Sequence, residues 1–336
     1  MPKSMLDTIK ESPLQFKFEP KIENENELVR KKTVIVGGMG GSNLATGFLW
    51  VYNPKLHIIT HRSYGLPDAD DEILNDSMAI ASSYSGNTEE TIDFFNKSKE
   101  RGLPLIAITA GGRLLELAKA SGVPFIQIPD TGIEPRAAMA FSFMALLKAI
   151  GDGGALVEMA KLADSLNPAD YENLGKSIAD AIKGHVPVIY SSTINGPLAR
   201  NWKINLNESG KTPSFYNVFP ELNHNEMTSF SAGGGSAFGG DVHSEASTLS
   251  EKFHFIFLSD DTDNSRIQKR MEITNKMFED KGMPVEIVKL ESGRGVFYKI
   301  FSSVVLAQWT AHFVAENYGL NDSEVPMVEE FKKLME

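Results

Sequence analysis

Short apolar runs alternate with helix-like segments along this chain, and that alternation restricts its fold more than any other feature. Runs such as KTVIVGG, SMAIASS and LPLIAITA end in glycine or in hydroxyl-bearing turns. The segments between them, such as NTEETIDFFNKSKERG, have helical periodicity and contain helix start and stop residues. Buried strands that alternate with helices are typical of a parallel sheet wrapped by helices on both faces.

The alternation occurs twice. After a glycine-rich linker at 151–154, it restarts with VPVIYSS, roughly 150 residues after KTVIVGG, and continues through KFHFIFLSD and MPVEIVKL. The 336 residues are enough for two cores of ~150 residues each. We therefore predict an α/β protein with two doubly wound units. An N-terminal lead-in covers 1–30, the first unit 31–152 and the second unit 153–336.

Composition excludes several classes of protein. The net charge is −11, with 33 Lys and Arg against 44 Asp and Glu, which argues against a nucleic-acid partner because such binding needs a basic surface. A small anion can still bind where local donors oppose the overall field. Cysteine is absent, so thiol catalysis, disulfides and Cys-based zinc sites are excluded. The N-terminus has no signal-type apolar region and Ala137–Ile150 is too short to span a membrane, so we expect a cytoplasmic protein.

Two turns at strand ends point to a ligand. GGMGGSN does not fit a dinucleotide fingerprint, because Asn43 stands at the third glycine position and the next strand ends in His61 and Arg62 in place of an acid. No P-loop is present, and GxSxG is absent around Ser42 and Ser85. The motifs of the common nucleotide and hydrolase sites are therefore missing.

What remains is a pair of turns rich in hydroxyls, with Ser42 in one and Ser83, Ser85 and Thr88 in the other. The carboxyl ends of parallel strands are where open α/β sheets bind ligands, and helix N-termini there favour anions. A phosphate monoester fits these donors. Capping alone also explains part of the pattern, since Asn87 with Glu90 three residues later predicts an N-cap that begins a helix.

VIVGGMGGSNLA together with SSYSGNTEET resembles the sugar isomerase (SIS) domain, a phosphosugar-binding module. RNWKINLNES, FPELNHNEM, RIQKRMEITNKMFEDKG and VEEFKKL resemble the bifunctional phosphoglucose/phosphomannose isomerase family, in consistent order over nearly the whole chain. The resemblance implies two SIS-type units and a cytoplasmic homodimer. It also implies a metal-independent, cofactor-free aldose–ketose isomerase of carbohydrate metabolism. Such an enzyme interconverts glucose 6-phosphate, and mannose 6-phosphate, with fructose 6-phosphate through a cis-enediol(ate).

The resemblance also assigns four catalytic residues. Glu208 matches the glutamate that moves the proton between C2 and C1, and Arg136 matches an arginine that stabilises the enediolate oxygen. His224 matches the ring-opening histidine, which comes from the neighbouring subunit, and Lys332 matches the assisting lysine. Without the resemblance, a solvated helix-end carboxylate and a loop histidine are the plainer interpretations of Glu208 and His224.

Further positions follow from the same resemblance. Ser323 matches a hydroxyl position associated with the use of both C2 epimers, and the phosphate is assigned to the turns that contain Gly41, Ser42, Ser83, Ser85 and Thr88. NESGKTP stands where the family has a NENAK-like string, so the residues after Glu208 differ from the family pattern. The glycine-rich stretch 231–241 is longer than the connection that the family usually has at this place. We predict a mobile loop there, with a lid over a site as the alternative.

Other readings stay open at this point. The HNE of 224–226 and the DVHSE of 241–245 contain metal-ligand side chains, but no tight ligand spacing such as HExxH occurs, so no metal is expected. Glu221 and Glu226 are candidates to orient the imidazole of His224. The chief functional alternative is a non-catalytic phosphosugar sensor. An aminosugar synthase is disfavoured because its attached glutaminase usually needs a cysteine nucleophile.

Overall fold

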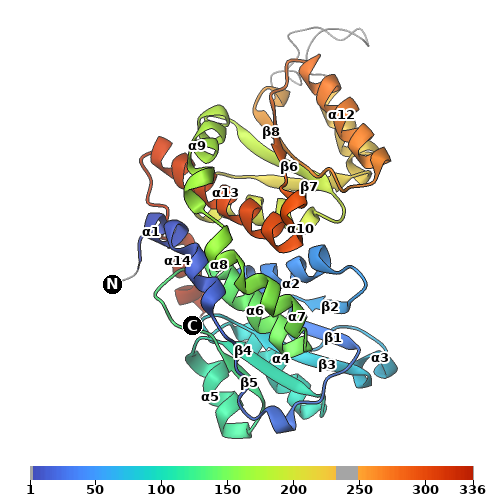
Figure 1. The fold of residues 1–336 in the computed structure, drawn as a ribbon, viewed down its shortest axis with the longest axis vertical. Helices are drawn as coiled ribbons and strands as arrows, with labels where there is room; N and C mark the ends of the chain where they lie inside the picture. Colours follow the sequence, from blue (N-terminus) through green and yellow to red (C-terminus); the bar gives the residue numbers. More distant parts are fainter. Residues whose placement is uncertain (1–2, 232–248, 336) are drawn as a thin grey trace. The chain divides into compact units, whose positions relative to one another are not determined.

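The computed structural model describes residues 3–231 and 249–335. Its contacts divide the chain into two compact units, Met1–Asn167 and Pro168–Glu336. Each unit has a sheet with helices on both faces, as Figure 1 shows. The expected glycine-rich loop at 231–241 lies outside the described residues except for Ser231.

The sheet of unit 1 contains five parallel strands in the order β2-β1-β3-β4-β5. This order places β1 beside β3, with the chain running outward from them in both directions, which is the topological switch point of a doubly wound sheet. The elements of unit 1, with 3₁₀ helices written η, are α1 (Met5–Lys10), η1 (Ser12–Lys17), η2 (Glu25–Glu27), β1 (Thr33–Gly37), α2 (Gly40–Tyr52), β2 (His57–His61), α3 (Asp71–Asn75), β3 (Ser77–Ser82), α4 (Glu89–Glu100), β4 (Leu105–Thr109), α5 (Gly112–Ser121), β5 (Phe125–Gln127), η3 (Pro135–Ala137), α6 (Met139–Ile150), α7 (Gly153–Ala160) and α8 (Leu162–Ser165).

The core of unit 1 forms because alternate strand residues enter opposite faces of the sheet. On one face, Ile35 and its neighbours pack against Phe94 and Phe95 of α4 and Leu114 of α5. A side chain at Gly37 would lie 2.3 Å from the Phe94 ring, so this glycine lets the aromatic ring approach the strand. Helices α2 and α6 contact each other and the strands. The apolar runs in the sequence are therefore strands that are buried on both faces.

Unit 2 repeats this architecture with four parallel strands in the order β7-β6-β8-β9. Its elements are η4 (Pro168–Tyr171), α9 (Glu172–Ala181), β6 (Val186–Ser192), α10 (Gly196–Glu208), β7 (Phe215–Phe219), η5 (Glu221–Asn223), η6 (Glu226–Phe230), β8 (Phe253–Ser259), α12 (Ser265–Glu279), β9 (Val285–Lys289), η7 (Ser292–Arg294), α13 (Val296–Asn317) and α14 (Pro326–Met335). The order matches β2-β1-β3-β4 of unit 1, so the predicted duplication of a doubly wound unit is confirmed.

The two faces of the second sheet carry different elements. The crossovers β6-α10-β7 and β8-α12-β9 move in opposite directions across the sheet, and right-handed crossovers then place their helices on opposite faces. An aromatic cluster fills the α12 face, where Tyr190, Phe255 and Phe257 pack against Phe278 and Leu222. α10 packs with α13 on the other face, where the Trp202 Nε1 donates to the Ser303 Oγ at 3.0 Å.

The lead-in and the linker belong to unit 1. Ile9 and Phe16 of the lead-in are buried, and the Gln15 side chain donates to the Ala137 carbonyl at 2.8 Å. Helices α7 and α8, which follow the expected boundary at 152/153, also cluster with the first unit. The division between the units therefore falls at 167/168, after these two helices.

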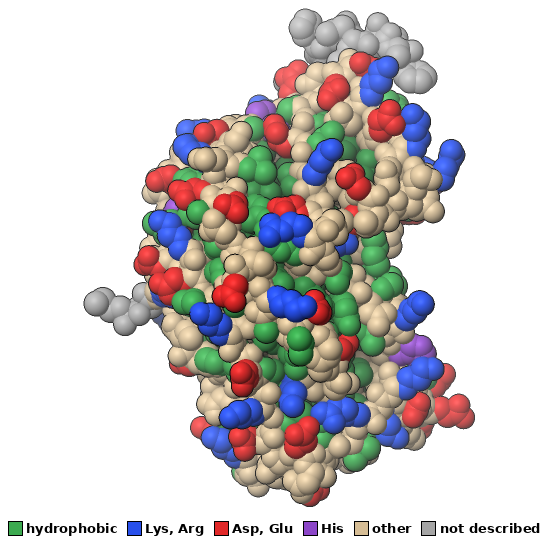
Figure 2. All heavy atoms as spheres, in the orientation of Figure 1, with side chains coloured by type: hydrophobic (Ala, Val, Ile, Leu, Met, Phe, Trp, Pro, Cys, Tyr) green, Lys and Arg blue, Asp and Glu red, His purple; other side chains and the backbone are tan. Residues whose placement is uncertain are grey.

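The face of the protein seen in Figure 2 carries mixed charge. In Figure 2, basic and acidic side chains are interspersed over the face in view. Within the described part of the chain, no helix is long and apolar enough to cross a bilayer.

His254 predicts a pH dependence of stability. His254 lies on β8 and its side chain is 3% exposed. Burial, together with the nearby His185, lowers the pKa of His254 to about 4. The carboxylate of the half-exposed Glu286, 3.6 Å away, does not offset this shift. The folded state therefore resists protonation of the ring, so its contribution is complete above pH 6.5 and is lost as the pH falls toward 4. We expect this one group to lower the free energy of unfolding by up to about 3 kcal/mol over that interval.

Urea unfolding at several pH values measures this slope. The slope should be shallower in His254→Leu than in the wild type, and it should be unchanged in His57→Gln, where the histidine is exposed on β2. Equal slopes in His254→Leu and the wild type would contradict the assignment.

Candidate active site

The predicted phosphate-binding turns lie side by side in unit 1. β1 and β3 are hydrogen-bonded neighbours, so the turn after each strand lies at the same edge of the sheet. The Ser42 Oγ, in the first turn of α2, accepts a hydrogen bond from the Tyr84 N–H at 2.9 Å. A side chain at Gly38 would lie 2.6 Å from the Ser82 carbonyl oxygen, so glycine is needed for this close approach. Ser42 and Tyr84 are 42 residues apart in sequence, so two distant turns form one surface.

The second turn holds three of the predicted hydroxyls, and two of them are in direct contact. Ser83 and Thr88 share a hydrogen bond of 2.8 Å between their hydroxyls, and the Ser83 Oγ also accepts from the Gly86 N–H at 3.1 Å. The Ser85 side chain is exposed, and its Oγ accepts from the Asn87 N–H at 3.3 Å. Gly86 has a φ of +72°, and a side chain on it would overlap the Gly111 carbonyl. The turn is therefore held in one shape with its hydroxyls in place.

Asn87 does not cap the helix that follows it, so that prediction was wrong. The N-cap of α4 is Thr88, whose side chain makes no capping hydrogen bond. The Asn87 Oδ1 instead accepts from the Arg113 N–H at 3.0 Å, in the first turn of α5. Asn87 thus links the β3–α4 turn to the start of α5, and the Thr88 hydroxyl is not used for capping.

Arg136 lies beside the first turn. A side chain at Gly41 would lie 2.7 Å from the Pro135 carbonyl oxygen and 3.0 Å from the Arg136 nitrogen, so η3 packs against the start of α2. The Arg136 side chain is 3% exposed, and its Nη1 lies 3.4 Å from a Glu134 carboxylate oxygen. Because Gly41 has no side chain, the backbone of Arg136 can lie next to the turn that contains Ser42.

These features together are those expected of an anion site. The first N–H groups of α2 and α4 have no intrahelical acceptors, as at every helix start, and both helices begin at this edge. Neither N-cap side chain makes a capping hydrogen bond. Hydroxyls and helix dipoles at one edge favour a phosphate group without requiring a fixed positive charge in direct contact.

Glu208 and Ser323 lie near each other in unit 2. Glu208 is the last residue of α10 and is half-buried. The Lys211 ammonium donates to the carbonyl oxygens of Glu208 and Glu324, which links the end of α10 to the segment containing Ser323. The Ser323 hydroxyl donates to the Asp322 carboxylate at 3.0 Å. Both predicted residues thus belong to one corner of unit 2.

His224 and Lys332 occupy separate exposed positions in the same unit. His224 follows η5, and its ring has no hydrogen-bond or ion-pair partner among residues 3–231 and 249–335. The two acids considered as its partners are engaged elsewhere: Glu221 accepts from the Asn225 side chain at 2.7 Å, and Glu226 bonds Tyr190. Lys332 lies on α14 and pairs with Glu329 at 2.7 Å.

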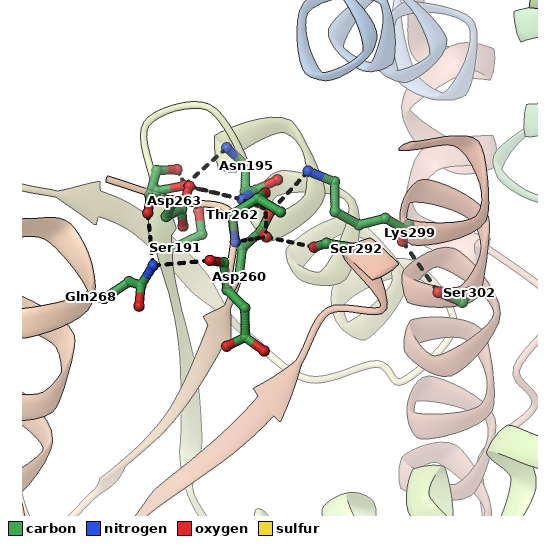
Figure 3. Close-up of polar contacts among 11 residues, drawn as sticks. Ser191, Asn195, Asp260, Thr262, Asp263, Gln268, Ser292, Lys299 and Ser302 are labelled. Carbon is green, nitrogen blue, oxygen red and sulfur yellow. Dashed lines mark hydrogen bonds and ion pairs between the residues drawn. The ribbon is translucent and has the colours of Figure 1, made fainter. Parts of the chain in front are cut away.

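The equivalent edge of the second sheet is filled by the protein itself. At the carboxyl ends of β6 and β8, the buried Asp260 carboxylate accepts from the Lys299 ammonium at 2.8 Å, the Asn195 amide at 3.0 Å and the Thr262 hydroxyl at 2.6 Å (Figure 3). Ser292 also donates to it. Burial opposes ionisation, but these hydrogen bonds outweigh it and hold the pKa of Asp260 well below its usual value.

This network was not anticipated from the sequence. A lone lysine in the apolar segment VFYKIFSSVV and the acidic string SDDTDN after a buried strand were its only signals. The carboxylate takes the donors that an anionic ligand would need at this edge.

The metal hypothesis gains no support from the part of the chain that the structure describes. No group of three or more His, Asp or Glu side chains within 3–231 and 249–335 is arranged to hold a metal ion. The 241–245 half of the proposed ligand set lies outside the described residues.

Comparisons with known proteins agree with this architecture. Residues 171–335 match the family described as the bacterial phospho-glucose isomerase C-terminal SIS domain. The crystal structure of glucosamine-6-phosphate deaminase from Thermotoga maritima superposes with a TM-score of 0.64 at 16% identity, covering 96% of each chain. The fold and the matched domain family thus define a protein of the SIS class, with two parallel α/β units.

Two curated relatives refine this class. The chain is 31% identical over 325 residues to the bifunctional phosphoglucose/phosphomannose isomerase of Aquifex aeolicus, covering 95% of this chain and 94% of that protein. The D-glucosamine-6-phosphate 4-epimerase of Sulfolobus acidocaldarius is 31% identical over 205 residues, covering 60% of this chain and 65% of that protein. The chain belongs to the bifunctional phosphoglucose/phosphomannose isomerase family, as its sequence motifs predict.

Proposed function

We propose that this protein is an aldose–ketose isomerase that converts glucose 6-phosphate and mannose 6-phosphate to fructose 6-phosphate and back. The observation that carries the proposal is the unit 1 edge, where the Ser42–Tyr84 and Ser83–Thr88 hydrogen bonds gather hydroxyls beside two helix N-termini. The 6-phosphate binds there. Family membership over 95% of the chain supports the isomerase chemistry.

Glu208 carries the proton in this proposal. Its carboxylate removes the C2 proton of the open-chain aldose, the C2–H electron pair forms the C1–C2 double bond, and the carbonyl oxygen becomes an enediolate. The proton of the C2 hydroxyl moves to O1, and the resulting carboxylic acid returns a proton to C1, so that O2 becomes the ketose carbonyl and the carboxylate is restored. Arg136 stabilises the enediolate oxygen, because a fixed guanidinium interacts most strongly when the negative charge develops. A planar enediolate accounts for turnover of both C2 epimers.

His224 and Lys332 open the sugar ring by moving the proton of the anomeric hydroxyl to the ring oxygen. We assign the histidine to the partner subunit. Within one chain, α10 with Glu208 and the η5–η6 segment with His224 pack on opposite faces of the second sheet. This separation, together with the exposed imidazole, supports a homodimer in which each site is completed by His224 of the partner subunit.

The test is turnover by purified protein in the presence of EDTA, with glucose 6-phosphate and mannose 6-phosphate offered separately. Fructose 6-phosphate formed from both substrates supports the proposal. Binding of several sugar phosphates without product would establish a non-catalytic sensor instead. Glucosamine 6-phosphate belongs in the same assay, because a partial relative is named as an epimerase of that sugar phosphate.

Thr88→Val tests the phosphate site. The substitution keeps the shape of the side chain but removes its hydroxyl. That hydroxyl is hydrogen-bonded to the Ser83 hydroxyl and makes no capping hydrogen bond. We expect KM to rise by roughly 10-fold with little change in kcat, because the phosphate is bound equally in the ground and transition states. Ser121→Ala is the control, since the Ser121 hydroxyl donates to the Leu117 carbonyl at the end of α5. Unchanged KM in Thr88→Val would remove this residue from the site.

A further inference from the structure

His224 is exposed, yet the residues on both sides of it are held to the body of unit 2. On the N-terminal side, the Asn223 amide donates to the Thr274 hydroxyl at 2.9 Å and its oxygen accepts from Arg270 at 3.3 Å. Thr274 and Arg270 both belong to α12. Leu222, which precedes Asn223, is fully buried in the aromatic cluster. This side of the histidine is therefore anchored to a helix.

On the C-terminal side, Glu226 is anchored to the sheet. One oxygen of its carboxylate accepts from the Tyr190 hydroxyl at 2.6 Å, and the other accepts from the Asn217 amide. Tyr190 is a β6 residue with no exposed surface, and Asn217 is on β7. Burial and the Glu226 carboxylate raise the pKa of Tyr190, so its hydroxyl remains a donor. The acid therefore has two fixed partners, one on each of two neighbouring strands.

The Tyr190 ring is itself fixed by its neighbours. It contacts Phe219, Phe255 and Phe257 with ring centroids 5.5 to 6.0 Å apart. A rigid aromatic cluster thus determines where the phenol oxygen lies, and the phenol determines where Glu226 lies. Thr193 adds a hydrogen bond of 2.9 Å to the Phe219 carbonyl, at the point where the chain leaves β7.

We propose that Glu226, held by Tyr190 and Asn217, is a positioning residue that fixes the segment 223–226 so that His224 is presented in one orientation for ring opening. This inference rests on the proposed function, because it assumes that His224 acts on the sugar ring. Ring opening requires the imidazole within hydrogen-bond reach of the sugar, and a displacement of about 1 Å can cost roughly 100-fold in rate.

A double-mutant cycle tests the proposal. Tyr190→Phe removes the hydroxyl and leaves the ring packing intact, and we expect it to lower kcat by roughly 10-fold to 100-fold with KM unchanged. In a His224→Asn background, Tyr190→Phe should cause no further loss, because its effect passes through the histidine. If Tyr190→Phe does not fold, Glu226→Gln takes its place in the same cycle, since it removes the charge that both partners contact.

The matched control is Tyr171→Phe. Tyr171 is also buried in unit 2 and donates to a glutamate, Glu291, at 2.5 Å. Loss of the Tyr171 hydroxyl should leave kcat unchanged. This result would show that breaking a buried Tyr–Glu hydrogen bond does not in itself lower kcat.

The outcomes separate the two levels of the argument. A wild-type protein without isomerase activity, or a fully active His224→Asn, overturns the role of the histidine itself. An impaired His224→Asn combined with a Tyr190→Phe at the wild-type rate overturns only the positioning role. Equal losses from Tyr190→Phe in both backgrounds also overturn it, because the tyrosine then acts independently of His224.

Discussion

Glu208→Gln is expected to lower kcat by roughly 10²- to 10⁴-fold while KM for the hexose phosphates stays nearly the same. Glutamine keeps the size of the side chain and its place at the end of α10, but it cannot accept the C2 proton. The proposed phosphate site is in unit 1, so substrate affinity should survive the substitution. Steady-state kinetics with both epimers measure the effect.

Glu324→Gln is the matched control for this prediction. Glu324 is an exposed acid near Glu208. The Lys211 ammonium donates a hydrogen bond to the backbone carbonyls of both residues. Its neutralisation changes the charge of this corner without touching the proposed base, so kcat should stay at the wild-type value. Full activity in Glu208→Gln would mean that another group moves the proton.

Lys299→Met is expected to lower the free energy of unfolding by about 3–5 kcal/mol, because it leaves the Asp260 carboxylate charged and buried without its cation. Asp260 has no exposed side-chain surface, and the Lys299 side chain is 8% exposed. Methionine fills most of the volume of the lysine stem, so the loss is chiefly electrostatic. Urea or thermal unfolding at pH 7 measures it.

An exposed ion pair of unit 2 provides the comparison. Lys176 and Asp180 are 3.0 Å apart with half-exposed side chains, so Lys176→Met should change stability by less than about 1 kcal/mol. Combining Lys299→Met with Asp260→Asn should restore part of the loss, because no unpaired charge is then buried. A Lys299→Met protein as stable as Lys176→Met would show that the buried pair contributes nothing to the fold.

The fold was predictable wherever burial leaves a local signature. Strands buried on both faces, such as β3 and β4, appear as unbroken apolar runs, and the turns between them contain glycine at positive φ. β7 was not predicted because it is an edge strand: Phe215 and Tyr216 are largely exposed, and Asn217 interrupts the apolar pattern. Only its pairing with β6 makes it a strand.

The hydroxyls of the proposed phosphate site were predictable because most of them lie in one turn. Ser83, Ser85 and Thr88 lie within six residues at a strand end, so their clustering follows from the sequence. Arg113 lies 26 residues from Asn87, Tyr190 lies 36 residues from Glu226, and Lys299 lies 39 residues from Asp260. Such pairs depend on tertiary packing, and no local pattern identifies them.

The central claim, that the protein isomerises hexose phosphates by proton transfer through an enediolate, is tested most directly in deuterium oxide. Fructose 6-phosphate is incubated with the enzyme in this solvent, and the products are followed by nuclear magnetic resonance. The account predicts both glucose 6-phosphate and mannose 6-phosphate, with deuterium accumulating at C2 over repeated turnovers because the Glu208 proton exchanges with solvent. Products that carry no deuterium at C2 after many turnovers, or no product at all, would contradict it.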